Sequence, residues 1–260
     1  MSQLLEPTAL WDRKKTLPNA DFCLFSCFLR CKFTTLHRIT RQFFAKMNTK
    51  IKNIIFDLGG VILDIDETVV YKELEKLGIS TSELAHSKDF IEIMSKFDTG
   101  IYTAPTFRRK MKALIGQEKM TDQRFDAIWN AMLLDIPRER IEAIEKVKKH
   151  YKIFLMSNTN EIHYDLYVRD LQLRFGYKEF DALFHKSYFS FAEHLEKPDP
   201  RFFELILDHE GLQPEETLFI DDTAKNIQVA QSLGIRTYHI SREELVRNLF
   251  ENGVLKEGVV

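Results

Sequence analysis

Carboxylates and a hydroxyl group follow short apolar runs at three distant places in the sequence. Asp57 comes after Ile-Ile-Phe, Ser157 after Phe-Leu-Met, and the pair Asp221 and Asp222 after Leu-Phe-Ile. Three carboxylates that lie together repel one another unless a cation lies among them, and Mg²⁺ prefers oxygen ligands. These residues predict a magnesium site if the fold brings the three places together.

A fourth place contributes a positive charge. Lys197 lies in Glu-Lys-Pro-Asp-Pro, just before a run with apolar residues at helical spacing, Phe202 to Ile206. An ammonium group and the Ser157 hydroxyl together suit a phosphoryl group, whose oxygens need charge neutralisation and hydrogen-bond donors. The four places therefore indicate phosphoryl chemistry at a metal site.

Five short apolar runs predict the strands that position these side chains. Helical patterns lie between most of the runs, and this alternation predicts an α/β fold with a parallel sheet covered by helices on both faces. Ligands of such sheets bind at the carboxyl ends of the strands, so polar residues that end strands converge on one edge. The predicted strands are Ile54–Phe56, Tyr151–Met156, Ala182–His185, Leu218–Ile220 and Ile235–Ile240.

A long interval without a strand pattern separates the first two predicted strands. An insertion of about 70 residues is too long for a simple crossover between adjacent strands. We therefore expect a helical cap domain, residues 67–134, inserted into a core domain made of residues 47–66 and 135–260. Apolar residues three or four positions apart predict four cap helices, over 67–78, 82–96, 103–115 and 121–134.

The composition narrows the class of protein. The chain has 260 residues, 44% hydrophobic and 29% charged, which is typical of a globular protein with a buried core. A formal net charge of -2 provides no overall basic field, so we expect no nucleic acid partner. No stretch approaches the roughly 20 apolar residues that cross a bilayer, so we expect no membrane span.

The first 46 residues differ from the rest of the chain. They contain all three cysteines, Cys23, Cys27 and Cys31, and basic residues outnumber acidic ones eight to three there. The spacing would place the thiols on one side of a helix, which could bind a metal, although no His or Cys pair with the usual zinc spacing accompanies them. The basic segment also allows a targeting signal. We favour an accessory or disordered extension, with the functional domain beginning at Met47. The cysteine-free body suits a reducing cytoplasm.

The order of the four places resembles the four motifs of the haloacid dehalogenase superfamily. Each motif is weak alone, but SNT, KPDPRFF and FIDD follow FDLGG in the same order at strand ends, with a helical insertion after the first. The resemblance spans residues 51 to about 245. FDLGGVILDID is similar to the phosphatase branch with a small cap, which includes sugar-phosphate phosphatases and the amino-terminal phosphatase domain of soluble epoxide hydrolase. It implies a Rossmann-like core.

The resemblance also implies roles for individual residues. Asp57 matches the nucleophile that forms an aspartyl-phosphate. Asp57, Asp221, Asp222 and the backbone carbonyl of Gly59 match the ligands of Mg²⁺, with Asp222 the more direct of the acidic pair. The groups that match the phosphate pocket and hold the nucleophile are Ser157, Asn158, Lys197, Gly59 and Gly60.

Ordinary structural explanations exist for the same residues. Asp57 is also a residue type common in strand-end turns, and the adjacent Asp221 and Asp222 could cap the helix predicted near Ala224. Asn226 stands where many relatives have another Asp, and either orients Asp222 or caps the helix.

Two further segments have both a structural and a functional interpretation. The Asp98–Tyr102 turn resembles a substrate-specificity loop and equally fits a plain interhelical turn. His163 either reaches the site or is a helix-surface or packed histidine, and we favour the second interpretation.

One residue departs from the family pattern. Most phosphatases of this superfamily have a second Asp two residues after the nucleophile, which protonates the leaving oxygen and activates water, but this chain has Gly59 there. Losing a positioned acid typically costs about 100-fold to 10,000-fold in rate. We therefore favour a substrate whose leaving group needs little protonation, such as a sugar-1-phosphate. Asp64 and Asp66 are alternative acids, or plain hinge residues.

The sequence leads to one favoured function and two rivals. We expect a magnesium-dependent cytoplasmic phosphatase, a monomer or homodimer, that acts on a small phosphate ester. A dehalogenase would use the same nucleophile on a haloacid and dispense with the second Asp, but its chemistry needs no metal, whereas Asp221 and Asp222 indicate one. A catalytically silent binding protein is the other rival, because Gly59 removes a major catalytic group.

Overall fold

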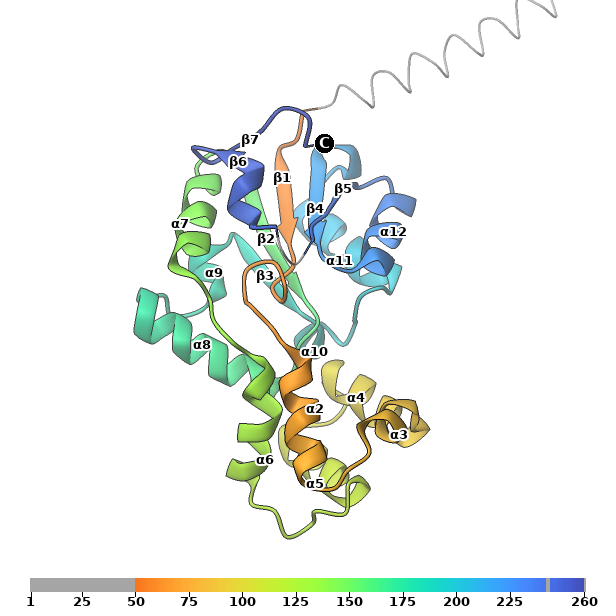
Figure 1. Ribbon diagram of the computed structural model, residues 1–260. Coiled ribbons are helices and arrows are strands. Elements are labelled where there is room, and N and C mark those ends of the chain that lie inside the picture. The colour runs from red at the N-terminus through yellow and green to blue at the C-terminus, as the bar shows by residue number, and fades with distance from the viewer. Residues whose placement is uncertain (1–49, 242–243, 260) are drawn as a thin grey trace, which may run out of the picture. The chain divides into compact units, whose positions relative to one another are not determined.

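The computed structural model describes residues 50–241 and 244–259 (Figure 1). The predicted amino-terminal extension, residues 1–46 with Cys23, Cys27 and Cys31, lies outside the described residues. Among the residues that are described, no helix is both long enough and apolar enough to cross a membrane.

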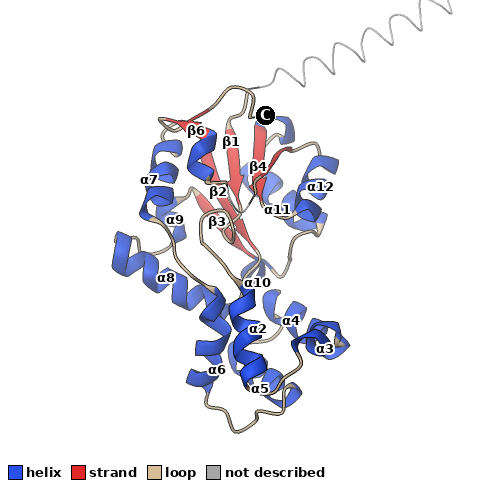
Figure 2. Cartoon of the chain, viewed as in Figure 1, coloured by secondary structure: helices blue, strands red, loops and turns tan. Residues whose placement is uncertain are grey.

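A five-stranded parallel sheet lies at the centre, with strand order β3-β2-β1-β4-β5 (Figures 1 and 2). Side chains alternate between its faces, so that Ile54 and Phe56 of β1 enter one hydrophobic cluster and Ile55 enters another. Both clusters are buried, which explains why the strands have continuous apolar runs. The strands are β1 Asn53–Phe56, β2 Lys152–Ser157, β3 Lys186–Phe189, β4 Thr217–Asp221 and β5 Arg236–His239.

Helices cover both faces of the sheet, as the sequence predicted. One face packs against α7 Arg138–Val147, α8 Glu161–Phe175, α9 Phe180–Leu183 and η3 Val246–Leu249. The other face packs against α11 Pro200–Glu210 and α12 Ala224–Ser232. The remaining short elements of this half are α10 Ser190–Glu193, η2 Pro214–Glu216 and the hairpin of β6 Phe250–Glu251 and β7 Val254–Leu255.

One predicted strand was wrong. The run Ala182–His185 is not a strand: Phe180–Leu183 forms the one-turn helix α9, and β3 begins at Lys186. Leu183 and Phe184 are buried in the same cluster as the sheet, so the run is apolar for a different reason. A short buried run does not reveal by its periodicity whether it is helix or strand.

Within the stretch between β1 and β2, residues 67–134 form a segment of helices joined by turns, which we call the cap segment (Figure 2). Its own hydrophobic cluster includes the stacked rings of Phe97 and Phe107, whose centroids are 3.9 Å apart. The division into core and cap domains at residues 66 and 135 stays a prediction. The cap helices are α2 Glu67–Lys76, α3 Thr81–His86, α4 Lys88–Asp98, α5 Ala104–Leu114, α6 Asp122–Trp129 and η1 Asn130–Met132.

The helix predicted over residues 82–96 is two helices. Ser87 has extended backbone angles and its hydroxyl accepts a hydrogen bond from Phe90 N, which caps the start of α4. The predicted helix over 121–134 is shorter as well, because α6 gives way to the 3₁₀ turn η1 at Asn130.

The two chain segments that join the cap segment to the sheet run side by side. Asp64 N donates to Asp135 O, and Leu134 N donates to Asp64 O. The Asp64 carboxylate also forms an ion pair of 2.7 Å with Arg140, which is buried. The chain therefore leaves the core and returns to it at one place.

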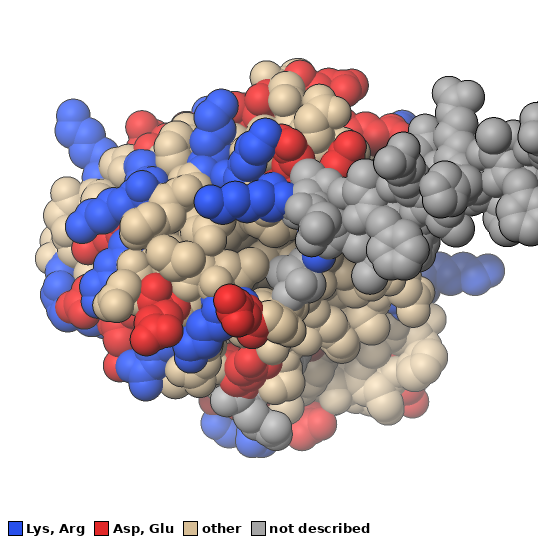
Figure 3. All heavy atoms as spheres, turned by 90° about the horizontal axis from the view of Figure 1, so that it is seen from above, with Lys and Arg blue, Asp and Glu red and all other residues tan. Residues whose placement is uncertain are grey.

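Charged side chains of both signs are interspersed on the face seen in Figure 3. This distribution accords with the small net charge of the whole chain.

Candidate active site

The sheet brings three of the predicted residues to one edge. Phe56 of β1 pairs with Leu155 of β2 on one side and with Ile220 of β4 on the other. Asp57, Ser157 and Asp221, which follow those three partners by one or two positions, consequently emerge side by side at the carboxyl ends of adjacent strands. The predicted convergence of distant segments is therefore present in the fold.

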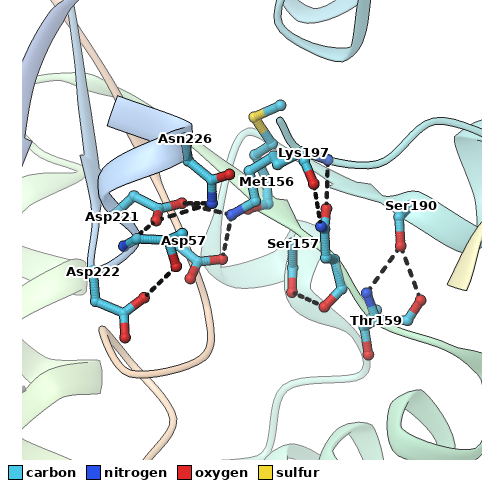
Figure 4. A network of polar contacts seen from close by, with 11 residues as sticks. Asp57, Met156, Ser157, Thr159, Ser190, Lys197, Asp221, Asp222 and Asn226 are labelled. Atoms are coloured by element: carbon cyan, nitrogen blue, oxygen red, sulfur yellow. Dashed lines mark hydrogen bonds and ion pairs between the residues drawn. The ribbon is translucent and has the colours of Figure 1, made fainter. Parts of the chain in front are cut away.

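Lys197 lies between two carboxylates (Figure 4). Its Nζ is 2.6 Å from Asp57 Oδ1 and 2.7 Å from Asp221 Oδ2, and it also donates to the carbonyl of Met156 at 3.1 Å. All three charged residues are buried, and Asp221 is fully so. Three donated hydrogen bonds saturate the ammonium group and fix its position.

Asn158 holds the backbone of Lys197. The Asn158 amide donates to Lys197 O and accepts from Lys197 N, both at 2.8 Å. This paired contact joins the loop after β2 to the loop before α11. Asn158 therefore lies at the site, as predicted, and the structure adds its contact with the lysine backbone.

The two adjacent acids have different surroundings. Asp221 Oδ1 accepts from Thr223 N at 2.7 Å, and the Asn226 amide donates to both oxygens of Asp221 at 3.0 and 3.1 Å. Asp222 is only half-buried, and Thr223 Oγ1 donates to it at 3.2 Å. The sequence left open whether Asn226 orients Asp222 or caps the helix; in the structure its amide contacts Asp221.

Gly60 allows Asp222 to approach the backbone. Gly60 has a φ of +74°, and a Cβ at this position would lie 2.4 Å from Asp222 Oδ2. Any other residue would both strain the backbone and displace the carboxylate. The second glycine of the FDLGG run therefore leaves room for the carboxylate of Asp222, an acid far along the chain.

Burial and charge oppose one another at the nucleophile candidate. Burial raises the pKa of Asp57 to about 7, although the nearby Lys197 ammonium lowers it. Burial alone would lower the pKa of Lys197, but the carboxylates of Asp57 and Asp221 outweigh it and raise that pKa. The lysine therefore remains charged, and any further cation at the site would favour the ionised form of Asp57.

The carboxylates fit a divalent cation by their chemistry and spacing. Asp57, Asp221 and Asp222 each offer one oxygen, and these oxygens all lie within 4.8 Å of one another. One lysine charge does not balance three carboxylates, and an all-oxygen donor set suits Mg²⁺.

A cavity of about 270 Å³ opens above these groups, and we call it the core cavity. Ser157 does not line it: this side chain is buried, and its hydroxyl donates to Asn158 O at 3.4 Å. The core cavity is lined by Asp57, Gly59, Ile65, Glu67, Asn158, Lys197, Pro198, Asp222, Thr223, Lys225 and Asn226.

The proposed substitute acids are engaged elsewhere. Asp64 pairs with Arg140, and Asp66 caps α2 by accepting from Thr68 N at 3.0 Å. Neither side chain lines the core cavity. Both residues therefore act as structural residues of the segment that enters the cap.

A second cavity of about 340 Å³, the cap cavity, lies between the cap helices and the loop after β2. It adjoins the core cavity, since Ile65, Glu67 and Asn158 line both. Its apolar lining is Ile65, Val70, Tyr71, Leu74, Leu84, Ala85, Phe90, Met94, Trp129 and Met132, and its polar lining is Glu67, Thr81, Asp98, Asn158, Thr159, Asn160 and His163.

Burial shifts the pKa of two polar groups of the cap cavity in the direction of their neutral forms. Burial raises the pKa of Asp98 to about 7, and Asn160 donates to its carboxylate at 3.1 Å. Burial lowers the pKa of His163 to about 4, so this ring is neutral. The ring stacks on Trp129, and its Nδ1 forms a hydrogen bond with Asn130 Oδ1. His163 is thus packed, as we favoured, and also lines a cavity.

The sequence analysis missed several residues at the site. Asn160 caps α8 by accepting a hydrogen bond from His163 N. The Ser190 hydroxyl accepts a hydrogen bond from the N–H of Thr159 and donates one to its carbonyl. The Asn160 cap has a sequence signal, a polar residue just before a helix. Ser190 and Glu67 have none, because their place depends on the path of the whole chain.

Comparison with known proteins supports the same assignment. A profile of haloacid dehalogenase-like hydrolases matches residues 51–234. The chain belongs to the haloacid dehalogenase-like hydrolase family. Its fold agrees with a solved structure of the family, the enzyme bt-2542 of Bacteroides thetaiotaomicron in complex with magnesium and inorganic phosphate. The two share 33% identity, with a TM-score of 0.69 over 77% of this chain and 100% of that one.

Two curated relatives of this haloacid dehalogenase-like hydrolase are phosphatases. D-ribitol-5-phosphate phosphatase of Bacteroides thetaiotaomicron is 29% identical over 72% of this chain and 91% of its own length. Sesquiterpene phosphatase astK of Aspergillus oryzae is 26% identical over 75% of this chain and 92% of its own length. The predicted fold class, family and enzyme class, a phosphoric monoester hydrolase, are thereby confirmed.

Proposed function

We propose that the chain is a magnesium-dependent phosphatase that transfers the phosphoryl group of a small phosphate monoester to Asp57 and then to water. The observation that carries this proposal is the contact of Asp57 with Lys197, at the floor of a cavity that Asp222 also lines. A nucleophile beside a fixed ammonium group and further carboxylates suits phosphoryl transfer, which depends mainly on positioning and on charge neutralisation.

Each residue has a proposed part in the reaction. The Asp57 carboxylate attacks phosphorus, and Lys197 neutralises charge on the nucleophile and on the phosphoryl oxygens. Asp57, Asp222, Asp221 and the carbonyl of Gly59 would hold the cation, and Asp221 also accepts a hydrogen bond from Lys197. Bound Mg²⁺ supplies further positive charge for the phosphoryl oxygens. Ser157 and Gly60 do not line the core cavity, and their part in phosphate binding stays a prediction.

We propose a sugar or polyol phosphate as the substrate, in particular a sugar-1-phosphate. The name of the D-ribitol-5-phosphate phosphatase relative supports a polyol phosphate. Uncharged hydrogen-bonding groups of the cap cavity, such as the amides of Asn158 and Asn160, suit hydroxyl groups. The 1-phosphate follows from Gly59, since a hemiacetal leaves more easily than an ordinary alcohol when no acid stands at this position.

A second substrate class is favoured by one observation. Most of the cap cavity's lining residues are aliphatic, aromatic or methionine side chains, which suit an apolar organic group. The sesquiterpene phosphatase relative is named for such a substrate. A terpenoid alcohol phosphate is therefore the alternative to a sugar phosphate in a substrate screen.

Activity with and without magnesium tests the proposed function. The purified protein is screened on phosphate monoesters with Mg²⁺ or with a chelator, beside Asp57→Asn and the control Asp208→Asn, an exposed residue on α11. We expect Mg²⁺-dependent release of phosphate by the wild type and the control, and no detectable release by Asp57→Asn. Haloacid turnover without metal would instead identify a dehalogenase, and no turnover of either class a binding protein.

Two glucose phosphates with different leaving groups test the sugar-1-phosphate proposal. We expect a higher kcat/KM for glucose-1-phosphate than for glucose-6-phosphate. A clear preference for the 6-phosphate would contradict the 1-phosphate proposal and leave the phosphatase proposal intact. The cytoplasmic location also remains a proposal, supported by the absence of cysteine from residues 47–260.

A further inference from the structure

The space beside Gly59 is occupied by an apolar side chain. A Cβ at Gly59 would lie 3.3 Å from Ile65 Cδ1, and Ile65 lines both cavities. The position where the second Asp of the family pattern would project is thus filled by an isoleucine from the segment that enters the cap. Among the described residues that line the core cavity, Glu67 is the one carboxylate besides Asp57 and Asp222.

Glu67 is the carboxylate on this segment that faces the site. It lies two residues after Ile65, is the first residue of α2, and lines both the core cavity and the cap cavity. Among the described residues, no hydrogen bond or ion pair engages its carboxylate. The neighbouring acids differ, because Asp64 pairs with Arg140 and Asp66 caps the helix.

The surroundings of Glu67 favour a base over an acid. Glu67 is exposed, and it stands at the amino-terminal end of a ten-residue helix, where the helix dipole stabilises a negative charge. A carboxylate at such a place suits the role of a proton acceptor.

We propose that Glu67 is the general base that activates water for hydrolysis of phospho-Asp57. This inference rests on the proposed function. The leaving group departs where the core cavity meets the cap cavity, because the organic part of the substrate lies in the latter. Water then enters from the same side, and the residues shared by the two cavities, Glu67 among them, surround this passage.

The two half-reactions then balance as follows. In the first, an Asp57 oxygen bonds to phosphorus, the bond to the leaving oxygen breaks with its electron pair, and that oxygen takes a proton from solvent. In the second, the water oxygen bonds to phosphorus while Glu67 takes a proton from the water. The acyl-phosphate bond breaks with its electron pair returning to Asp57, and Glu67 loses its proton to solvent.

Phosphorylation of Asp57 and hydrolysis of phospho-Asp57 can be distinguished by experiment, because only the second step uses Glu67. Without an acid, the first step depends on the leaving group, in accord with the proposed sugar-1-phosphate. The second step does not depend on it and requires Glu67. A substrate with a good leaving group, such as p-nitrophenyl phosphate, therefore reports the second step alone when that step is slowed.

Rapid-mixing kinetics of Glu67→Gln on p-nitrophenyl phosphate with Mg²⁺ test the proposal. We expect a burst of about one p-nitrophenol per active site, trapped acyl-phosphate on Asp57, and a steady state about 100-fold to 10,000-fold below wild type. Formate is expected to restore part of the turnover of Glu67→Ala. Glu73→Gln, on the same helix but outside both cavities, is the matched control and should match wild type.

Other outcomes overturn the inference. A steady-state rate of Glu67→Gln equal to that of wild type shows that the base lies elsewhere. A loss of the burst together with turnover shows that Glu67 acts before or during phosphorylation. If the wild type hydrolyses no phosphate ester, the proposed function itself fails, and this result is distinct from both.

Discussion

Lys197 is the residue on which the charge balance of the site depends. It is buried with Asp57 and Asp221, and one oxygen of each carboxylate lies 2.6 or 2.7 Å from its ammonium nitrogen. Removing one partner of such a group leaves a buried charge uncompensated, which typically costs about 3–5 kcal/mol. Asn158 holds the backbone of Lys197, and Asn226 holds the carboxylate of Asp221. Two amide side chains therefore fix the surroundings of one ammonium group.

The contact between Gly60 and Asp222 leads to a first prediction. Gly60→Ala places a methyl group where Asp222 Oδ2 lies and a side chain on a positive φ, which costs about 1–3 kcal/mol. We expect a lower unfolding free energy, and a Mg²⁺ concentration for half-maximal activity at least about 10-fold higher. Gly116→Ala, also at positive φ but with open space around it, should lower stability without affecting the Mg²⁺ requirement. An unchanged requirement in Gly60→Ala would contradict the argument.

The pKa of Asp98 leads to a second prediction. Because burial raises the folded-state pKa to about 7 from 3.8, the folded protein binds an extra proton between these values. The wild type therefore loses stability as pH rises toward about 7, on the order of 2 kcal/mol since Asp98 is partly in contact with solvent. Asp98→Asn keeps the acceptor for Asn160 and does not titrate.

The measurement is urea unfolding of both proteins from pH 4 to pH 8. We expect equal unfolding free energies near pH 4 and a more stable Asp98→Asn variant at pH 8. A difference that does not change with pH would show that Asp98 titrates normally.

The cap helices depend on aromatic packing between elements. Phe97 of α4 and Phe107 of α5 stack, and Phe107 also contacts Phe125 and Trp129 of α6 edge-on. Arg108 of α5 adds two hydrogen bonds to the carboxylate of Asp126 on α6, at 2.7 and 2.8 Å. The cap helices α4, α5 and α6 are thus held together by one cluster of aromatic rings.

Truncation of this centre is the third prediction. Phe107→Ala removes a fully buried ring that contacts two other helices, and such changes cost about 3–5 kcal/mol. We expect this loss in chemical denaturation, and a lower kcat/KM because the cap cavity loses its shape. Ile101→Ala, at a position 64% exposed, should stay within about 0.5 kcal/mol of wild type. A loss under about 1 kcal/mol for Phe107→Ala would argue against the cluster.

The elements show how far sequence reasoning reaches. Asp57 and Asp221 were located correctly because a polar residue after a buried apolar run marks a strand end, and parallel strand ends share an edge. The run Ala182–His185 failed because burial alone does not distinguish helix from strand. Glu67 was missed because a glutamate that begins a helix is usually explained by the helix dipole, and its cavity forms only when two distant segments meet.

At the scale of the whole molecule, two adjoining cavities differ in charge. The core cavity is lined by Lys197 and Lys225, whereas no lysine or arginine is among the described residues that line the cap cavity. The phosphoryl group that reacts lies beside the lysines of the core cavity. A second phosphoryl group on the same substrate would be buried in the cap cavity without a lysine or arginine beside it. The organic part of the substrate is therefore expected to be uncharged.

Discrimination against a second phosphate is the fourth prediction. We expect kcat/KM for glucose-1,6-bisphosphate to be at least about 10-fold below that for glucose-1-phosphate. Met94→Lys introduces a cation into the cap cavity and should narrow this ratio, while Ile91→Lys, an exposed position nearby in the sequence, should not. Equal kcat/KM values for the two esters in the wild type would show that the organic group lies outside the cap cavity.

The hydrogen bonds between Asp64 and its neighbours Leu134 and Asp135 have a consequence for how such a protein can be altered. Since the outgoing and incoming chains are already adjacent, a shorter, longer or foreign insert between them would leave the order of the sheet strands unchanged. A short linker there would leave the acidic pocket open to bulk solvent. A borrowed insert would offer the same reactive aspartate to a different family of esters.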